Sequence, residues 1–177
     1  MRFLKYVIGM AMVLLIGSVA PAQAADTTVT FTIQGGALTI SAPASVNLGN
    51  TASGATLQGT IGPVTVSDLR AALLGSWTAR VSSTDFTTGG GTANETIPKA
   101  DAAYASGAAT TATGVGTFTP GQLTVLLAQP LSAQVTAFTA TALVGNNTVT
   151  WNPTLRVTIP NSAVAGTYTG TVTHSVA

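Results

Sequence analysis

Hydrophobic and polar residues alternate along much of this 177-residue chain. The strongest alternation lies in Val64–Phe86, where Trp77 and Val81 share one parity and hydroxyl-bearing residues share the other. A period of two over four to eight residues is typical of a strand with one buried face. We therefore expect Val64–Phe86 to form a β-hairpin that turns near Gly75-Ser76, with the Trp77 indole in the core.

Other alternating runs predict further strands. Thr28–Ile33 and Ala37–Ile40 flank Gly35-Gly36, which predicts a second hairpin. The remaining strands are expected near Ser45–Leu48, Ala102–Tyr104, Leu123–Leu127, Ala133–Ala142, Thr148–Ile159 and Tyr168–Val176, with a turn at Asn146-Asn147. Together they predict an all-β fold, a sandwich of roughly seven to ten mostly antiparallel strands of Ig-like or Greek-key-like type.

Two local features refine this prediction. Pro153 has no backbone N–H to donate to a sheet, so it marks a bulge or an edge position. The sequence Gly166-Thr167-Tyr168 indicates a corner at which a tyrosine hydroxyl bonds back to the backbone. Only Asp68–Leu74 has any trace of helical spacing.

The first 25 residues have the pattern of a secretory signal peptide. Arg2 and Lys5 precede the apolar run Tyr6–Ala20, and Ala22-Gln23-Ala24 supplies the small residues of a cleavage site. A membrane anchor is the less favoured alternative, because the run is short and contains glycine. We expect a single secreted domain, residues 26–177, at the cell surface or cell wall, with no stable membrane span after the signal is removed.

Charge and cysteine content narrow the possible partners. Charged residues make up only 6% of the chain, and cysteine is absent. Without Arg2 and Lys5, four basic residues stand against five acidic ones, a net charge of −1. This balance leaves no basic patch for nucleic acid. Because no disulfide can form, the fold must depend on its core.

Five residues are candidates for ligand binding. Trp77 and Trp151 have faces suited to sugar rings, although their place in the apolar phase favours core packing. Asp68 and Arg70 share a parity and predict a charge-assisted pair, with Arg80 as a competing partner across the hairpin. Asp85 precedes the glycine-rich turn and is expected first to cap the strand end.

Nothing in the sequence indicates catalysis. His174 is the only histidine, and no nucleophile motif or metal-ligand spacing accompanies it. A packed strand residue is the expected role of His174. We therefore expect no catalytic residue, no metal and no cofactor.

Several short motifs carry a family resemblance. They are Val66-Ser67-Asp68-Leu69-Arg70, Ser76-Trp77, Val81–Phe86, Trp151-Asn152-Pro153-Thr154-Leu155 and Ala165–Gly170. In this order the chain resembles the WxL domain family of Gram-positive surface proteins, and its second half is similar to the actinobacterial WxL-like branch. The family's leucine two residues after tryptophan is Ala79 or Pro153 here. The resemblance implies a β-rich domain held noncovalently at the cell wall through peptidoglycan, often beside other surface proteins.

The leading hypothesis is therefore a noncatalytic secreted surface domain that associates with cell-wall peptidoglycan or with other surface proteins. One alternative is a structural subunit that assembles through edge strands, as pilin-like proteins do. A less favoured alternative is a glycan-active enzyme.

Overall fold

The computed structural model describes residues 23 and 25–177. The chain divides into two units, Met1–Thr32 and Ile33–Ala177. Among the residues that the structure describes, all strands belong to the second unit, and those of the first unit are exposed. The predicted signal peptide lies outside the described residues, apart from Gln23 and Ala25. In the described part of the chain, no helix is long and apolar enough to cross a membrane.

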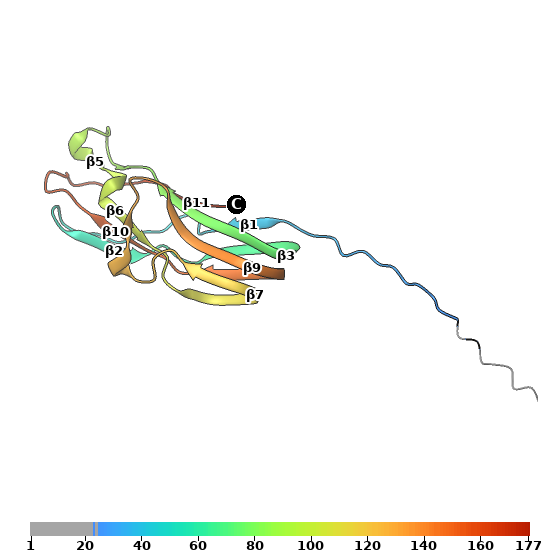
Figure 1. Cartoon of the computed structure of the whole chain (residues 1–177). Coiled ribbons are helices and arrows are strands. Elements are labelled where there is room, and N and C mark those ends of the chain that lie inside the picture. The colour runs from blue at the N-terminus through green and yellow to red at the C-terminus, as the bar shows by residue number, and fades with distance from the viewer. Residues whose placement is uncertain (1–22, 24) are drawn as a thin grey trace, which may run out of the picture. The chain divides into compact units, whose positions relative to one another are not determined.

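The second unit is a sandwich of two antiparallel sheets, which confirms the predicted all-β class (Figure 1). Sheet A has the order β1 (Leu38–Ser41), β3 (Val64–Ser83), β9 (Val135–Trp151) and β7 (Ala109–Pro120), and β11 (Val172–Val176) also pairs with β3. Sheet B has the order β2 (Thr56–Thr60), β10 (Thr154–Thr158), β6 (Ala102–Ala105) and β8 (Gln129–Pro130). The short strands β4 (Phe86–Thr87) and β5 (Thr96–Ile97) form a separate pair.

Three single-turn 3₁₀ helices connect these strands. They are η1 (Ala93–Glu95), η2 (Lys99–Asp101) and η3 (Val125–Leu127). The last of them replaces the strand predicted for Leu123–Leu127, and Leu126 is 90% exposed. That prediction was wrong because a short apolar run does not distinguish a strand from a helical turn.

Alternation along β3 and β9 builds the core. Val64, Trp77 and Val81 point inward from β3 and are almost fully buried, as the period-two pattern predicted. The Phe138 ring stacks on Trp151, with centroids 5.0 Å apart, and lies 6.5 Å from Trp77. Such aromatic pairs add about 0.5–1.5 kcal/mol beyond the area they bury.

The predicted hairpin at Val64–Phe86 is wrong, because the structure has one 20-residue strand, β3, through most of this stretch. β9 pairs with β3 from Val64 to Val81, so no turn forms at Gly75-Ser76. Extra residues are absorbed where the register shifts, and Ala71 and Leu74 adopt φ of 53° and 58°. Bulges of this kind bend a strand without ending it.

The turn predicted at Asn146-Asn147 is also wrong, since β9 continues through both residues. Asn147 is buried and lies opposite Asp68. The chain changes sheet later, at Asn152-Pro153, where β9 ends and β10 begins in the other sheet. Pro153 therefore stands between strands, which is compatible with its missing backbone donor.

Three other strand predictions differ from the structure. Only Leu38–Ser41 forms a strand in the expected N-terminal hairpin, and Thr28–Ile33 is not in any strand. Ser45–Leu48 lies in a loop. The final strand begins at Val172 rather than Tyr168. The strand expected near Ala102–Tyr104 is confirmed as β6.

Candidate functional site

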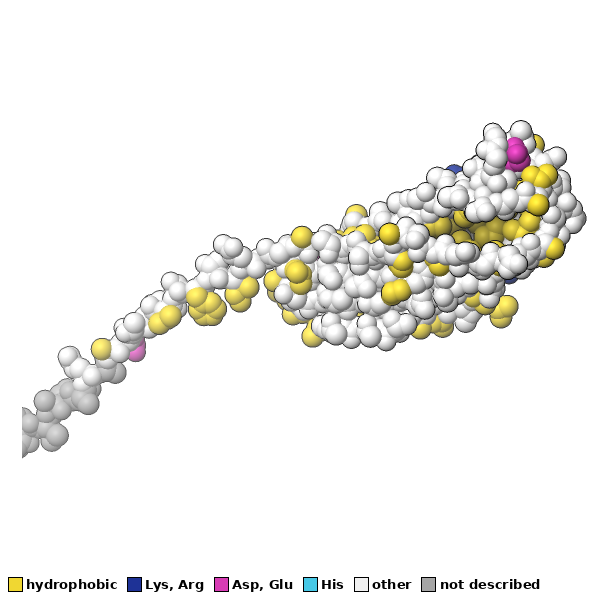
Figure 2. Space-filling model, turned by 180° about the vertical axis from the view of Figure 1, so that it is seen from behind, with side chains coloured by type: hydrophobic (Ala, Val, Ile, Leu, Met, Phe, Trp, Pro, Cys, Tyr) yellow, Lys and Arg dark blue, Asp and Glu magenta, His cyan; other side chains and the backbone are white. Residues whose placement is uncertain are grey.

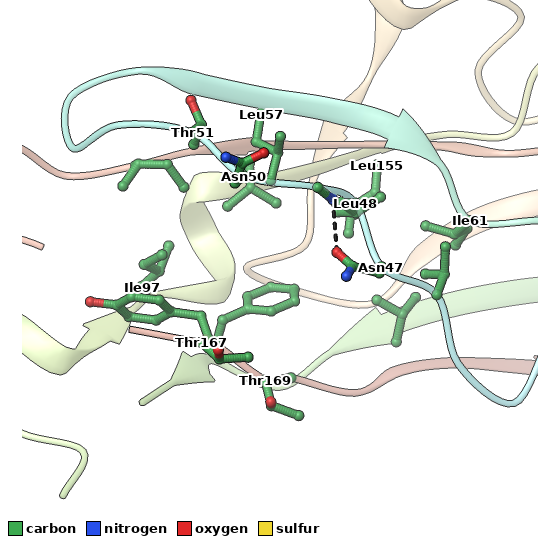
Figure 3. Close-up of a pocket in the computed structure, with 18 of the residues that line it drawn as sticks. Asn47, Leu48, Asn50, Thr51, Leu57, Ile61, Ile97, Leu155, Thr167 and Thr169 are labelled. Atoms are coloured by element: carbon green, nitrogen blue, oxygen red, sulfur yellow. Dashed lines mark hydrogen bonds between the residues drawn. The ribbon is translucent and has the colours of Figure 1, made fainter. Parts of the chain in front are cut away.

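A groove of about 970 Å³ lies between the two sheets, and we call it the intersheet groove. One wall comes from sheet B, with Leu57 on β2 and Leu155 on β10. The other comes from β11, with Val172 and His174, and residues 42–53 and 163–171 form loops around it. Figure 2 shows hydrophobic side chains gathered in a hollow of the molecule, and Figure 3 shows Leu57 and Leu155 among the lining residues.

The lining of the intersheet groove is uncharged at neutral pH. Its polar groups are mainly amides and hydroxyls, and Asn47, Asn50, Thr51, Thr167 and Thr169 are labelled in the close-up (Figure 3). No Asp, Glu, Lys or Arg occurs among the described residues that line it. A lining of apolar and neutral polar groups suits an uncharged ligand better than an ionic one.

Two strands that line the intersheet groove have an edge without a partner strand. In the described part of the chain, β2 pairs only with β10, and β11 pairs only with β3. Both strands contribute lining residues, Leu57 from β2 and His174 from β11. Unpaired strand edges carry backbone N–H and C=O groups that can bond to another extended chain.

His174 connects the intersheet groove to the core. The indole N–H of Trp151 donates to the Tyr104 hydroxyl at 2.9 Å, and that hydroxyl lies 3.2 Å from His174 Nε2. Because an indole N–H can only donate, the Tyr104 oxygen accepts this bond, while the direction of the bond between Tyr104 and Nε2 depends on the tautomer of His174. The other ring nitrogen of His174, Nδ1, is buried without a hydrogen-bond partner.

Burial keeps both His174 and Tyr104 uncharged at neutral pH. It lowers the pKa of His174 from 6.5 to about 4, because the charged imidazolium loses solvation. It also raises the pKa of Tyr104, for which the phenolate is the charged form. At neutral pH the groove therefore presents an uncharged histidine.

The loop on one side of the groove is held by Tyr168. The Tyr168 hydroxyl lies 2.9 Å from the Val164 carbonyl oxygen and 3.1 Å from that of Asn94. This is the tyrosine corner that the sequence predicted. Since Val164 and Tyr168 both line the groove, the bond fixes the shape of that wall.

The two tryptophans lie in the core. Trp77 is 2% exposed and Trp151 is 0% exposed. The Trp77 indole N–H donates to Asn147 Oδ1 at 3.2 Å. The structure therefore confirms core packing, the alternative that the apolar phase favoured for both residues. Neither indole lines the intersheet groove.

Asp68 and Arg70 form the predicted pair. Arg70 Nε lies 2.9 Å from Asp68 Oδ1, and Nη2 lies 2.8 Å from Oδ2. Nη2 also donates to the Ser76 carbonyl oxygen at 2.8 Å, so the pair spans the bulged segment of β3. The hydrogen bonds from Arg70 lower the pKa of the buried Asp68 carboxyl. Arg80 lies further along the same strand rather than across a hairpin, so it does not compete.

Asp85 is exposed, and its Oδ1 accepts a hydrogen bond from the Lys99 backbone N–H at 2.8 Å. It therefore ties the end of β3 to the start of η2 instead of capping the glycine turn. The structure does not bring the five predicted ligand-binding residues to one place. Among the five, only Asp68 and Arg70 bond to each other, and none of the five lines the intersheet groove.

A second feature is an apolar surface on the bulged part of sheet A, which we call the sheet A tip. It consists of Leu69, Leu73, Leu74, Val115 and Val144, which are 43–78% exposed. These residues come from β3, β7 and β9, where the register between strands shifts.

Sequence reasoning did not find the intersheet groove. Its residues come from segments far apart in the chain, and their small apolar and hydroxyl side chains carry no motif. Within the described residues, no group of three or more His, Asp or Glu side chains could hold a metal ion. Comparison of the chain with family models, with curated proteins and with solved structures finds no match.

Proposed function

We propose that this chain is a noncatalytic domain secreted to the cell surface, where its intersheet groove associates noncovalently with cell-wall peptidoglycan or with another surface protein. The signal pattern and the WxL-like motifs support this proposal. The observation that carries it is the intersheet groove itself, which is uncharged and lined by two strands that each have a free edge.

The chemistry of the groove supports a binding role over a catalytic one. A general acid or base works best with a pKa near the working pH, and burial lowers that of His174 to about 4. The Nε2 atom of His174 is already engaged in a hydrogen bond with the Tyr104 hydroxyl. No carboxylate lies among the described lining residues to act as a second group.

The free edges favour a protein partner over a glycan. An extended peptide that adds to a sheet edge forms backbone hydrogen bonds along its length, and alternate side chains enter the groove. A glycan has no regular row of backbone N–H and C=O groups that could pair with a strand edge. Peptidoglycan contains both glycan and peptide, so it stays among the partners to be tested.

The test combines wall binding with partner capture. The secreted form of the chain is incubated with purified peptidoglycan and pelleted, and in parallel it is cross-linked on intact cells. Thr169→Trp places a bulky ring at an exposed position of the groove, and Thr117→Trp places the same ring at an exposed position outside it.

The proposal predicts that Thr169→Trp lowers retention at least tenfold, whereas Thr117→Trp retains the wild-type level. If the wild-type chain stays entirely in the supernatant and captures no surface protein, the proposed function is wrong. Equal retention of the two variants would place binding outside the intersheet groove.

A further inference from the structure

The segment Thr28–Ile33 exposes an unusual amount of apolar surface. Val29, Phe31 and Ile33 are 79%, 84% and 77% exposed, and the segment is not in any strand. The three residues are spaced by two, so they share one face whenever the segment is extended. An exposed run with alternating apolar residues is a template for strand pairing unless something covers it.

The intersheet groove has the chemistry that this segment needs. Both are uncharged, since Thr28–Ile33 contains only threonine and apolar residues and the described groove lining contains no ionised group at neutral pH. The unpaired edges of β2 and β11 supply backbone partners for an added strand. His174 adds a buried Nδ1 atom that has no hydrogen-bond partner, and a backbone group of an entering strand would supply one.

The groove is also large enough for such a segment. The distance from Val29 to Ile33 in an extended strand is about 13 Å at 3.3 Å per residue. The three side chains on one face of the segment need an apolar space. The groove has a volume of about 970 Å³, which is at the upper end of the range for ligand cavities in proteins.

We propose that the intersheet groove of one copy of this protein receives the Thr28–Ile33 segment of a second copy as an added β-strand, with Val29, Phe31 and Ile33 facing inward. This inference rests on the proposed function, because it names the partner of the same groove. Donor and acceptor surfaces differ, so the contact is heterologous and produces rings or open chains of copies.

Insertion of the segment into the groove of its own chain is less favourable. The backbone that follows the segment is already bound to sheet A, because Gly36 N–H donates to the Leu69 carbonyl oxygen at 2.6 Å. A Cβ at Gly35 would lie 2.5 Å from the Arg70 carbonyl oxygen, so the backbone there is tightly enclosed. The backbone at Gly35 and Gly36 is therefore already held against sheet A, and we assign the groove to the segment of a second copy.

The first experiment measures assembly of the secreted chain by sedimentation velocity over a range of concentrations. We expect oligomers that increase with concentration. Phe31→Asp places a charge in the apolar groove and should weaken association at least about tenfold. Thr30→Asp is the matched control, because the side chain of residue 30 faces away from the groove in the proposed strand. Association of this variant should stay near the wild-type level.

The second experiment uses the absence of cysteine from the chain. Val29→Cys is mixed with Thr169→Cys in the groove, or with Leu126→Cys, which is 90% exposed and lies outside the groove. Oxidation should produce mixed dimers with Thr169→Cys and not with Leu126→Cys. Equal cross-linking to both acceptor positions would overturn the proposal.

Other outcomes separate this inference from the proposed function. A monomer at every concentration, combined with loss of wall or partner retention in Thr169→Trp, would overturn strand donation and leave the binding groove standing. Assembly that is abolished by Leu73→Asp but unaffected by Phe31→Asp would assign the contact to the sheet A tip and also overturn the inference.

Discussion

The indole N–H of Trp151 donates to the hydroxyl of Tyr104 across 2.9 Å, and this bond joins the two sheets. Trp151 ends β9 in sheet A, and Tyr104 lies on β6 in sheet B. Both side chains are fully buried, so neither can exchange its partner for water. The same hydroxyl lies within hydrogen-bond distance of His174 Nε2, and one oxygen therefore connects β6, β9 and β11.

Tyr104→Phe should lower the free energy of unfolding by about 2–3 kcal/mol, because it leaves the Trp151 N–H and His174 Nε2 without partners. Tyr168→Phe removes a more exposed hydroxyl and should cost about 1 kcal/mol. Urea denaturation of both variants measures the difference. Equal losses would mean that the buried hydroxyl contributes no more than the exposed one.

The stability of the fold should increase with pH between about 4 and 6.5 through His174. Its pKa is lowered to about 4 in the folded state, while the unfolded chain has the ordinary value of 6.5. In this interval the unfolded state binds the extra proton, so acid favours unfolding, and the stabilising effect is complete only above 6.5. Unfolding free energies of wild type and His174→Gln across this range give the dependence by difference. Parallel curves for the two proteins would contradict the prediction.

Asp68→Asn should cost about 1–2 kcal/mol, because it breaks a bidentate ion pair in which Asp68 is buried and Arg70 is partly exposed and screened by solvent. Since Arg70 lowers the pKa of Asp68, the stabilising effect is present above the ordinary value of 3.8 and is lost as pH falls through the lower folded value. Thermal and urea unfolding measure the cost at pH 7. Asp26→Asn, at an exposed position, should change stability by less than about 0.5 kcal/mol.

Gly121→Ala should destabilise the fold by at least about 2 kcal/mol, because the new Cβ would collide with the Thr136 carbonyl oxygen. Backbone atoms cannot move aside as a flexible side chain can. Gly90→Ala is the matched control, since its nearest contact is a glutamate oxygen at 3.6 Å. Melting temperatures of the two variants test the contrast, and a Gly121→Ala protein as stable as the control would contradict the geometry.

Local periodicity predicted which residues enter the core. Trp77, Val81 and Trp151 are buried as their parity required, because strand side chains alternate whatever their partners are. Local sequence predicts turns at Gly75-Ser76 and at Asn146-Asn147. Both pairs instead lie inside long strands, β3 and β9, and these two strands pair with each other. Pairing between segments so distant in sequence overrides local turn preference, and no local signal reports it.

The candidate site could not be predicted in the same way. The intersheet groove depends on Leu57 and His174 coming together from opposite parts of the chain, and on two edges being left unpaired. By contrast, the Asp68–Arg70 pair and the Tyr168 corner depend on residues two to four positions apart, so the sequence could indicate them.

β3 also determines how the sandwich responds to mechanical force. β1 and β11 pair with successive halves of the same edge of β3, while β9 occupies its other edge. The first residues of the sandwich bond to β3 at Leu69, and Ala177 exchanges backbone hydrogen bonds with Thr78. Leu69 and Thr78 lie between the two stretches of β3 that pair with β1 and β11, so tension that draws these two points apart pulls each terminal strand back over its own ladder. The bonds then open one by one, from Gly36 on one side and from Ala177 on the other.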